Sequence, residues 1–291
     1  MPYPLPRNGD YTVIMQFIDT GVNLMGPAFD RDREAALNAA KDAGVSPLVI
    51  TGSSIESSAG ALDFAAAHSG DCWATAGVHP HNAKTWDGLS LRRLRELAGR
   101  QFCAAVGECG LDYNRNFSPP GAQRKCFEDQ LTLAAELGKP VFLHERDAFE
   151  DFYFILKQFR RDLSGAVVHC FTGTQRELEA YLGLDCHIGI TGWICDERRG
   201  THLLPLLSLV PAGRLMLETD APYLLPRNLP REGTGAAAGS RSGRNEPRFL
   251  PHIAACAAAA LDKTLEQVAL ETFAAAAGFF GIKCGVSSSD V

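Results

Sequence analysis

AVVHCFTG (residues 166–173) is a short apolar run that ends in a histidine, His169, and is followed by turn-forming residues. Runs of this kind, rich in Val, Ile, Leu and Ala, are typical of buried strands. Three more segments have the same form: AAVGECGLD (104–112) with Glu108, PVFLHER (140–146) with His144, and LMLETDAPY (215–223) with Asp220. Four ligand-type side chains at the ends of four strands are what a metal site at the mouth of a parallel barrel requires.

The order of elements along the chain predicts the same architecture. The expected strands are 17–24, 47–53, 73–81, 104–112, 140–146, 166–173, 186–193 and 215–223. The expected helices are 30–43, 56–68, 89–100, 121–137, 148–160, 175–182 and 197–209, followed by 249–260 and 264–280. Alternation of this kind predicts an α/β fold, a (β/α)₈ TIM barrel. A doubly wound sheet is the competitor, but its G-x-G-x-x-G phosphate signature is absent.

The composition is that of an ordinary soluble globular protein. The 291 residues are 46% hydrophobic and 21% charged, and we expect one domain over 1–291, with the barrel from about 17 to about 281. The net charge of −6 argues against broad electrostatic capture of nucleic acid, so a polyanionic substrate must be held by local arginines or by metal. Nine scattered cysteines without a C-x-x-C pair favour a reducing compartment. With no signal peptide and no membrane-length apolar run, we expect a cytoplasmic protein without a membrane partner. We also expect a monomer.

Glu108, His144 and His169 provide two nitrogens and one oxygen, which suits a divalent ion such as Zn²⁺, Mn²⁺ or Mg²⁺ with positions left open for water. Such an ion lowers the pKa of bound water from about 15.7 towards about 7 and polarises a phosphoryl oxygen. Asp220 adds a carboxylate that could hold a second ion or take the proton from the attacking water. A single histidine at a strand end is more often a hydrogen-bonded structural residue. The agreement of four strands favours the metal site.

His79 and His81 form an H-x-H pair at the expected end of the third strand, where alternate residues face one side. Contact of one of them with substrate is the preferred interpretation, a structural role is close behind, and direct metal ligation is third. Asp112, Arg115 and Arg146 follow the fourth and fifth strands on the same face. Arginine offers a planar fork to phosphate oxygens, although each arginine could instead pair with a carboxylate.

Two further regions have simpler interpretations. The loop at 226–247 is polar and rich in Gly, Ser and Arg, and its place after the eighth strand puts it over the barrel mouth. Residues 287–291 are expected to fray. The remaining histidines are interpreted as structural or surface residues: His68, His187, His202 and His252.

Several blocks of the sequence resemble one known family. FIDTGVNL, TAGVHPH, VGECGLDYNRNFS, VFLHERDA, VVHCFTGT, IGITGWICDERRG, ETDAPYLLPR and RNEP are similar to the TatD family of metal-dependent deoxyribonucleases, and the similarity runs from about 17 to about 281. The resemblance implies an amidohydrolase-like (β/α)₈ barrel. It also implies a metal-dependent 3′→5′ exonuclease that favours single-stranded DNA, with RNA as a further candidate substrate and DNA repair or turnover as its setting.

The first strand departs from the family pattern. Many members carry D-x-H-x-H there, whereas this chain has Asp19, Gly21 and Asn23 at the D, H and H positions. Gly21 has no side chain to offer, and the Asn23 amide oxygen is a weak, hard ligand. We therefore expect one firmly bound ion on the residues that carry over intact, which are Glu108, His144 and His169. Asp220 would be a base or a ligand for a loosely held second ion, and Asn23 a substrate contact.

The sequence thus predicts a metal-dependent phosphodiesterase that acts on nucleic acid. Glu108 and Asp220 are the predicted catalytic groups, and the predicted substrate contacts are Asn23, His79, His81, Asp112, Arg115 and Arg146. A barrel-mouth pocket accepts a flexible single-strand end more easily than the middle of a stiff duplex, which favours exonuclease action.

Two alternatives stay open. An amidohydrolase or lactonase acting on a small metabolite would share the barrel and the metal. That chemistry often uses a carboxylated lysine on the fourth strand, where this chain has Glu108 and no lysine. A non-catalytic binding protein that descends from an enzyme would explain the missing histidines of the first strand, but the other four metal-type residues are intact.

Overall fold

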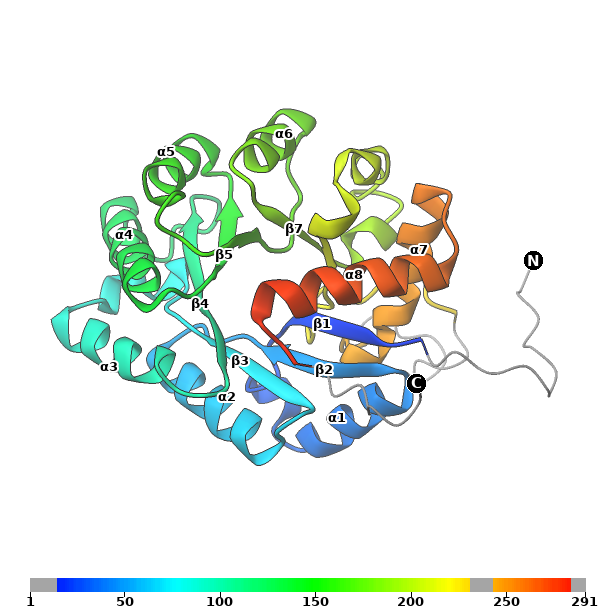
Figure 1. The fold of residues 1–291 in the computed structure, drawn as a ribbon, viewed down its shortest axis with the longest axis horizontal. Coiled ribbons are helices and arrows are strands. Elements are labelled where there is room, and N and C mark those ends of the chain that lie inside the picture. Colours follow the sequence, from blue (N-terminus) through cyan, green and yellow to red (C-terminus); the bar gives the residue numbers. More distant parts are fainter. Residues whose placement is uncertain (1–14, 231–242, 284–291) are drawn as a thin grey trace.

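A computed structural model describes residues 15–230 and 243–283 of the chain. Eight parallel strands run in chain order from β1 to β8, each paired with the next, and helices surround the curved sheet (Figure 1). The strands are β1 Phe17–Val22, β2 Val45–Ile50, β3 Cys72–Ala76, β4 Cys103–Asp112, β5 Val141–Arg146, β6 Ala166–Val168, β7 His187–Ile190 and β8 Leu215–Leu217. The predicted (β/α)₈ barrel is confirmed.

Apart from the segment 197–209, the helices begin and end close to the expected positions. The α-helices are α1 Arg33–Asp42, α2 Ile55–Ala67, α3 Gly88–Ala98, α4 Pro120–Leu137, α5 Phe149–Phe159, α6 Gln175–Gly183, α7 Leu250–Leu261 and α8 Leu265–Phe280. Capping explains several starts, because the Ser54, Thr174 and Thr264 side chains each accept a hydrogen bond from the backbone three residues on. No helix within the described ranges has the length and hydrophobicity needed to cross a membrane.

Hydrogen bonds outside the regular ladder join β1 to the segment after β8. The Thr219 backbone N–H donates to Asp19 Oδ1 over 2.9 Å, and the Thr219 hydroxyl donates to the other carboxylate oxygen. The Asp220 N–H donates to the Gly21 carbonyl over 2.9 Å. Asp19 is fully buried, so its carboxylate joins β1 to the segment after β8 within the core.

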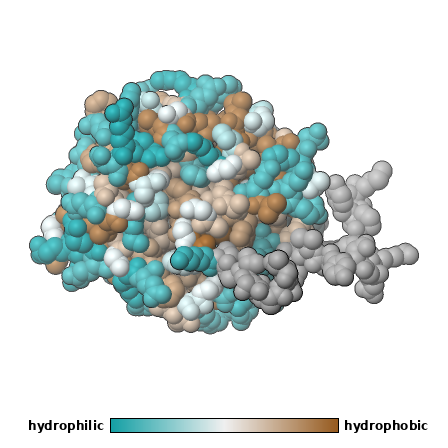
Figure 2. All heavy atoms as spheres, viewed as in Figure 1, coloured by the Kyte–Doolittle hydropathy of each residue, from teal (hydrophilic) through white to brown (hydrophobic). Residues whose placement is uncertain are grey.

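The barrel interior is packed with apolar side chains. They come from six strands: Ile18, Val49, Ala104, Ala105, Phe142, Val167 and Met216. Phe280 and Ile282, at the end of α8 and just beyond it, pack against this cluster and cover its amino-terminal end. In Figure 1 α8 crosses the near face, and Figure 2 shows that face as more apolar in its middle and hydrophilic around its edge. The opposite, carboxyl-terminal end is left for polar residues.

The expected helix at 197–209 is wrong. Residues 197–203 form turns, and a 3₁₀ helix, η4 Leu204–Leu209, follows them. Pro205 explains the difference, because proline has no N–H and its ring clashes with the carbonyl four residues earlier in an α-helix.

The expected third strand, 73–81, is too long. β3 ends at Ala76, and Pro80 begins the 3₁₀ helix η2 Pro80–Thr85. His79 is therefore the N-cap of a helix and His81 lies within it, so the two side chains are not an alternating pair on a strand. Residues 231–242 of the expected mouth loop, and 287–291, lie outside the described residues.

Replacing Asp19 with Ala should lower the free energy of unfolding by about 3 kcal/mol or more, because three buried donors lose their acceptor at about 1–3 kcal/mol each. The donors are the amide and hydroxyl of Thr219 and the amide of Gly21. Urea denaturation of the two proteins measures this difference.

Asp19→Asn is the matched control, because Asn keeps the shape and an acceptor oxygen but does not titrate. Burial raises the pKa of Asp19 to about 7, against the hydrogen bonds from Thr219 that lower it. The folded protein therefore holds this proton more tightly than the unfolded chain, and the stability that it contributes is lost as the pH rises from about 4 to about 7. The decline in stability between these pH values should be smaller in Asp19→Asn, and an equal decline would contradict this account.

Candidate metal centre

One cavity, of about 480 Å³, lies at the carboxyl ends of the strands. Its lining includes all the side chains singled out from the sequence: Asn23, His79, His81, Glu108, Asp112, Arg115, Arg146, His144, His169 and Asp220. Trp193, Tyr223 and Leu224 line it as well. The fold therefore brings together residues that lie nearly 200 positions apart.

Glu108 lies at the centre of this group. Its Oε1 atom is 2.8 Å from His169 Nε2, 2.9 Å from His144 Nδ1 and 3.3 Å from His79 Nε2. His144 Nδ1 and His169 Nε2 are 3.4 Å apart. Glu108, His79 and His169 are all less than a tenth exposed. Three imidazole nitrogens around one buried carboxylate oxygen form a donor set that can hold a divalent cation.

Burial and charge act against each other on these groups. Burial favours the neutral form of Glu108, but attraction to the His79 and His169 imidazoles and the hydrogen bonds from His144 and His169 hold its pKa well below its ordinary value. Burial lowers the pKa of His79 to about 4. Burial also opposes a charge on His144 and His169, yet the carboxylates beside them raise the pKa of both. A cation bound here would displace protons that these imidazoles otherwise hold.

The outer nitrogens of two imidazoles are unsatisfied. His144 Nε2 and His169 Nδ1 are buried and have no hydrogen-bond partner within the part of the chain that the structure describes. His169 Nδ1 lies 3.5 Å from Glu218 Oε1, and His144 Nε2 lies 3.5 Å from Asp112 Oδ2. Each imidazole thus has a carboxylate on the side away from Glu108, as histidine ligands of metals commonly do.

Asp112 lies behind the imidazoles and is almost completely buried. One of its carboxylate oxygens is 2.7 Å from His81 Nε2, and the other accepts the Arg115 backbone N–H over 2.8 Å. Burial opposes its ionisation, but attraction to the nearby His144 imidazole and the hydrogen bonds from His81 and the Arg115 backbone hold its pKa far below the ordinary value. The structure therefore places Asp112 where it orients two histidines. Its predicted contact with substrate stays a prediction.

Asp220 lines the cavity next to the end of β1. Its Oδ1 accepts a hydrogen bond of 2.8 Å from Asn23 Nδ2, and its other oxygen has no hydrogen-bond partner among residues 15–230 and 243–283. Burial raises the pKa of Asp220 to about 7, and the His169 charge opposes the rise. A carboxyl with a pKa near neutrality can exchange a proton at physiological pH.

Comparison with known proteins agrees with this site. A family model described as TatD related DNase matches residues 18–281. This chain belongs to the TatD-related DNase family. A Rahnella sp. protein named 3′-5′ ssDNA/RNA exonuclease TatD is 53% identical over 235 residues, which is 81% of this chain and 87% of the relative. An Erwinia amylovora protein of the same name is 49% identical over 265 residues, 91% of this chain and 99% of the relative.

Solved structures extend the comparison to the fold. A TatD homologue from Escherichia coli superposes with a TM-score of 0.82 at 27% identity, covering 93% of this chain and all of that one. A TatD-family hydrolase from Entamoeba histolytica gives 0.81 at 25% identity, with 91% and 98% covered. L-Hydantoinase from Arthrobacter aurescens, at 11% identity and a TM-score of 0.59, covers 92% of this chain and 73% of the hydantoinase, and shares the fold alone.

Glu218, which the sequence analysis did not select, lies beside Gly21 of the first strand. Glu218 is fully buried and accepts a hydrogen bond from the Cys170 backbone N–H. A Cβ atom at Gly21 would lie 2.5 Å from Glu218 Oε2, and one at Gly189 would lie 2.8 Å from Glu218 Oε1. The space that a side chain at position 21 would need is therefore filled by this carboxylate. Its signal in the sequence is an acid directly after the apolar run of β8.

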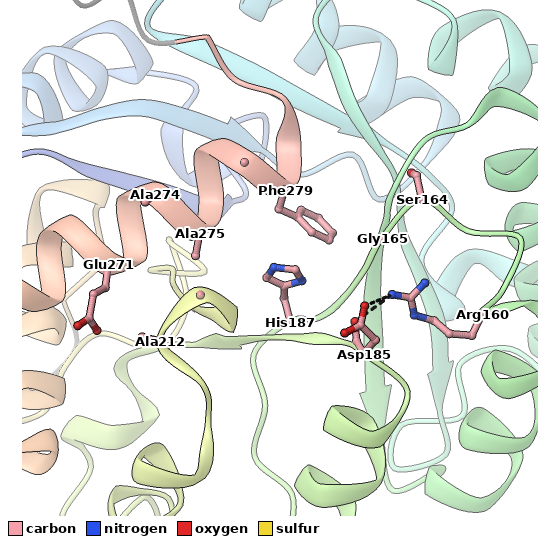
Figure 3. A pocket seen from close by; sticks show the side chains of 12 residues that line it. Arg160, Ser164, Gly165, Asp185, His187, Ala212, Glu271, Ala274, Ala275 and Phe279 are labelled. Atoms are coloured by element: carbon pink, nitrogen blue, oxygen red, sulfur yellow. Dashed lines mark hydrogen bonds and ion pairs between the residues drawn. The ribbon is translucent and has the colours of Figure 1, made fainter.

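A second cavity, of about 560 Å³, lies at the other end of the barrel. Figure 3 shows His187 and Phe279 facing it, with Arg160 and Asp185 joined as an ion pair at its side. Arg160 also donates to the carbonyls of Leu163 and Leu184. Arg160 is thus already paired, and within the described residues this cavity has no cluster of metal-binding side chains like the one around Glu108.

Gly21→Ala should lower the free energy of unfolding by about 1–3 kcal/mol, because the added methyl overpacks a rigid core. Gly88→Ala is the control, since a Cβ there meets nothing within 4 Å. The cause is tested by a double-mutant cycle with Glu218→Ala, in which the two losses should sum to more than the loss in the double variant. Strict additivity in chemical denaturation would show that Glu218 is not what excludes the side chain.

Proposed function

We propose that this protein is a metal-dependent 3′→5′ exonuclease that acts on single-stranded DNA and RNA. The observation that carries the proposal is the convergence of three imidazoles on the Glu108 carboxylate at the open end of a TatD-family barrel. The names of relatives at about half identity support the same activity and polarity. The proposal includes a cytoplasmic, monomeric protein that works in DNA repair or turnover.

The ion would be held by Glu108, His144 and His169. Two nitrogens and one oxygen suit Zn²⁺ or Mn²⁺, and Mg²⁺ is the third candidate. When bound, the ion would polarise a phosphoryl oxygen and lower the pKa of a water molecule. His79 also faces Glu108 and could complete the coordination or orient the carboxylate. Gly21 on β1 has no side chain that could bind an ion, and Glu218 fills the space beside it. We therefore propose one firmly held ion.

Asp220 would act as the base for the attacking water. Asn23 donates a hydrogen bond to one carboxylate oxygen, and the other, which has no partner in the described part of the chain, can accept a proton. With its pKa raised by burial to about 7, Asp220 can take that proton and release it to the solvent in each cycle. Glu108 cannot share this role, because the surrounding imidazoles keep its carboxylate ionised and occupied.

Arg115 and Arg146 would hold the phosphates. Both side chains are exposed at the cavity and form no ion pair among residues 15–230 and 243–283. Their guanidinium groups are thus available for phosphate oxygens, with which arginine forms paired hydrogen bonds. On a chain with a net charge of −6, such local cations provide the attraction that the whole protein does not.

Exposed aromatic side chains at the rim would hold the bases. Tyr223 is 61% exposed and lines the cavity, while Phe117 is 57% exposed with its ring 4.7 Å from the His81 ring. Stacking of a base on an aromatic ring contributes about 1–3 kcal/mol and requires an unpaired base. This rim therefore favours a single strand over a duplex.

A small-metabolite amidohydrolase is the less favoured alternative. The similarity to hydantoinase concerns the fold alone. The free arginines and rim aromatics fit a phosphodiester chain better than a small neutral amide. The intact imidazole cluster likewise argues against a binding protein without catalysis.

The direct test is a nuclease assay with a 5′-labelled single-stranded oligonucleotide. We expect products that shorten stepwise from the 3′ end, loss of activity with a chelator, and its return with Mn²⁺, Mg²⁺ or Zn²⁺. A 3′-terminal phosphorothioate and a matched duplex should both slow the reaction. Internal cuts, or turnover of an ester or amide reporter with no loss of nucleotides, would refute the proposal.

Asp220→Asn should retain the fold and the ion but lose about 10²–10⁴-fold in rate, the usual contribution of a general base. Asn keeps the size and one acceptor oxygen, so it separates proton transfer from packing. His169→Ala should instead lose metal and activity together. Metal content and single-turnover rates of both variants distinguish the two roles, and near wild-type turnover in Asp220→Asn would remove Asp220 from the mechanism.

A further inference from the structure

A second group of metal-binding side chains lies apart from the cavity at the barrel mouth. Cys195 is the last residue of the 3₁₀ helix η3 Gly192–Cys195, which follows β7. His252 and Cys256 are four residues apart on α7 and so lie on one face of that helix. One ligand atom from each of the three residues lies within 4.8 Å of the other two.

Polar contacts hold this group together. Asn228, in the segment after β8, donates from Nδ2 to Cys256 Sγ over 3.4 Å, and its Oδ1 lies 2.7 Å from His252 Nε2. Cys256 Sγ is 4.0 Å from His252 Nε2. Cys195 is buried, whereas His252 and Cys256 are partly exposed. An ion could therefore reach the group from the α7 side.

We propose that Cys195, His252 and Cys256 form a binding site for a thiophilic metal ion, with Zn²⁺ as its natural occupant. Zinc binds sulfur at about 2.3 Å and nitrogen at about 2.0–2.1 Å in a tetrahedron, so its ligand atoms lie about 3.3–3.8 Å from one another. The three atoms lie within 4.8 Å of one another, so small side-chain rotations would bring them to that spacing. The fourth position is left for water or for the Asn228 oxygen.

The donor set separates this site from the one at the barrel mouth. Thiolate sulfur selects Zn²⁺ and other soft or borderline ions over Mg²⁺, whereas Glu108, His144 and His169 offer only oxygen and nitrogen. An ion here would tie η3 to α7. Because η3 also carries Trp193, which lines the catalytic cavity, the ion would brace one wall of that cavity.

The test uses full-length protein that has been reduced and stripped of metal. Titration with Co²⁺, a spectroscopic substitute for Zn²⁺, should produce the near-ultraviolet charge-transfer band of a cobalt–thiolate bond. His169→Ala, which disrupts the mouth site, should retain that band with one equivalent of ion. Cys256→Ser and Cys195→Ser should lose the band and retain metal-dependent nuclease activity with Mn²⁺.

Thermal unfolding gives a second measurement. In the His169→Ala background, Zn²⁺ should raise the melting temperature, and adding Cys256→Ser should abolish that shift. Cys126→Ser, which changes a buried cysteine elsewhere, should leave the shift in place. Absence of the cobalt–thiolate band in the reduced wild type, or its persistence in both cysteine variants, would overturn the proposal. The proposal would also fail if Cys195 and Cys256 formed a disulfide and the protein bound no metal at this site after that disulfide was reduced.

Discussion

The hydrogen bonds between the buried Asp19 carboxylate and Thr219 connect the two ends of the sheet, and the site depends on that closure. Eight strands in a row would otherwise remain an open sheet with two edges. Closing it places Asp220, the next residue, at the end of β1, where its amide donates to Gly21 and its carboxylate meets Asn23. The same contacts that complete the barrel therefore position the proposed base.

Attraction between buried carboxylates and histidines explains how the other polar side chains are arranged at the barrel mouth. Glu108, Asp112 and Glu218 are buried carboxylates, and isolated charges of this kind are unfavourable inside a protein. Two histidines, His144 of β5 and His169 directly after β6, lie within 3.5 Å of these carboxylates. A divalent cation could replace protons in this cluster, because carboxylate oxygens and imidazole nitrogens are its usual ligands. This is why we regard the cluster as a prepared metal site and not as an ordinary polar core.

The sequence predicted much of this because strand-end positions are defined by a period of two and by the apolar runs before them. His169, directly after β6, could be placed in this way, whereas Glu108 lies within β4 and not at its end. The expected α-helix at 197–209 rested on the hydrophobic pattern, although Pro205 within it disfavours an α-helix. Glu218 could not be recognised, because its importance comes from the two glycines whose space it fills, and they lie on other strands. Proximity of that kind is a property of the closed barrel.

The 3₁₀ helix η3, which follows β7, contributes a residue to the wall of the mouth cavity and another to the proposed thiol site. Trp193 faces the catalytic cavity, and Cys195, two residues on, faces α7. The first group offers carboxylate and imidazole, a donor set that suits several divalent ions. The second offers two sulfurs and would hold Zn²⁺ in preference to the ions that hydrolysis can use. Since the ligands differ in softness, one protein can bind a structural ion and a catalytic ion without exchanging them.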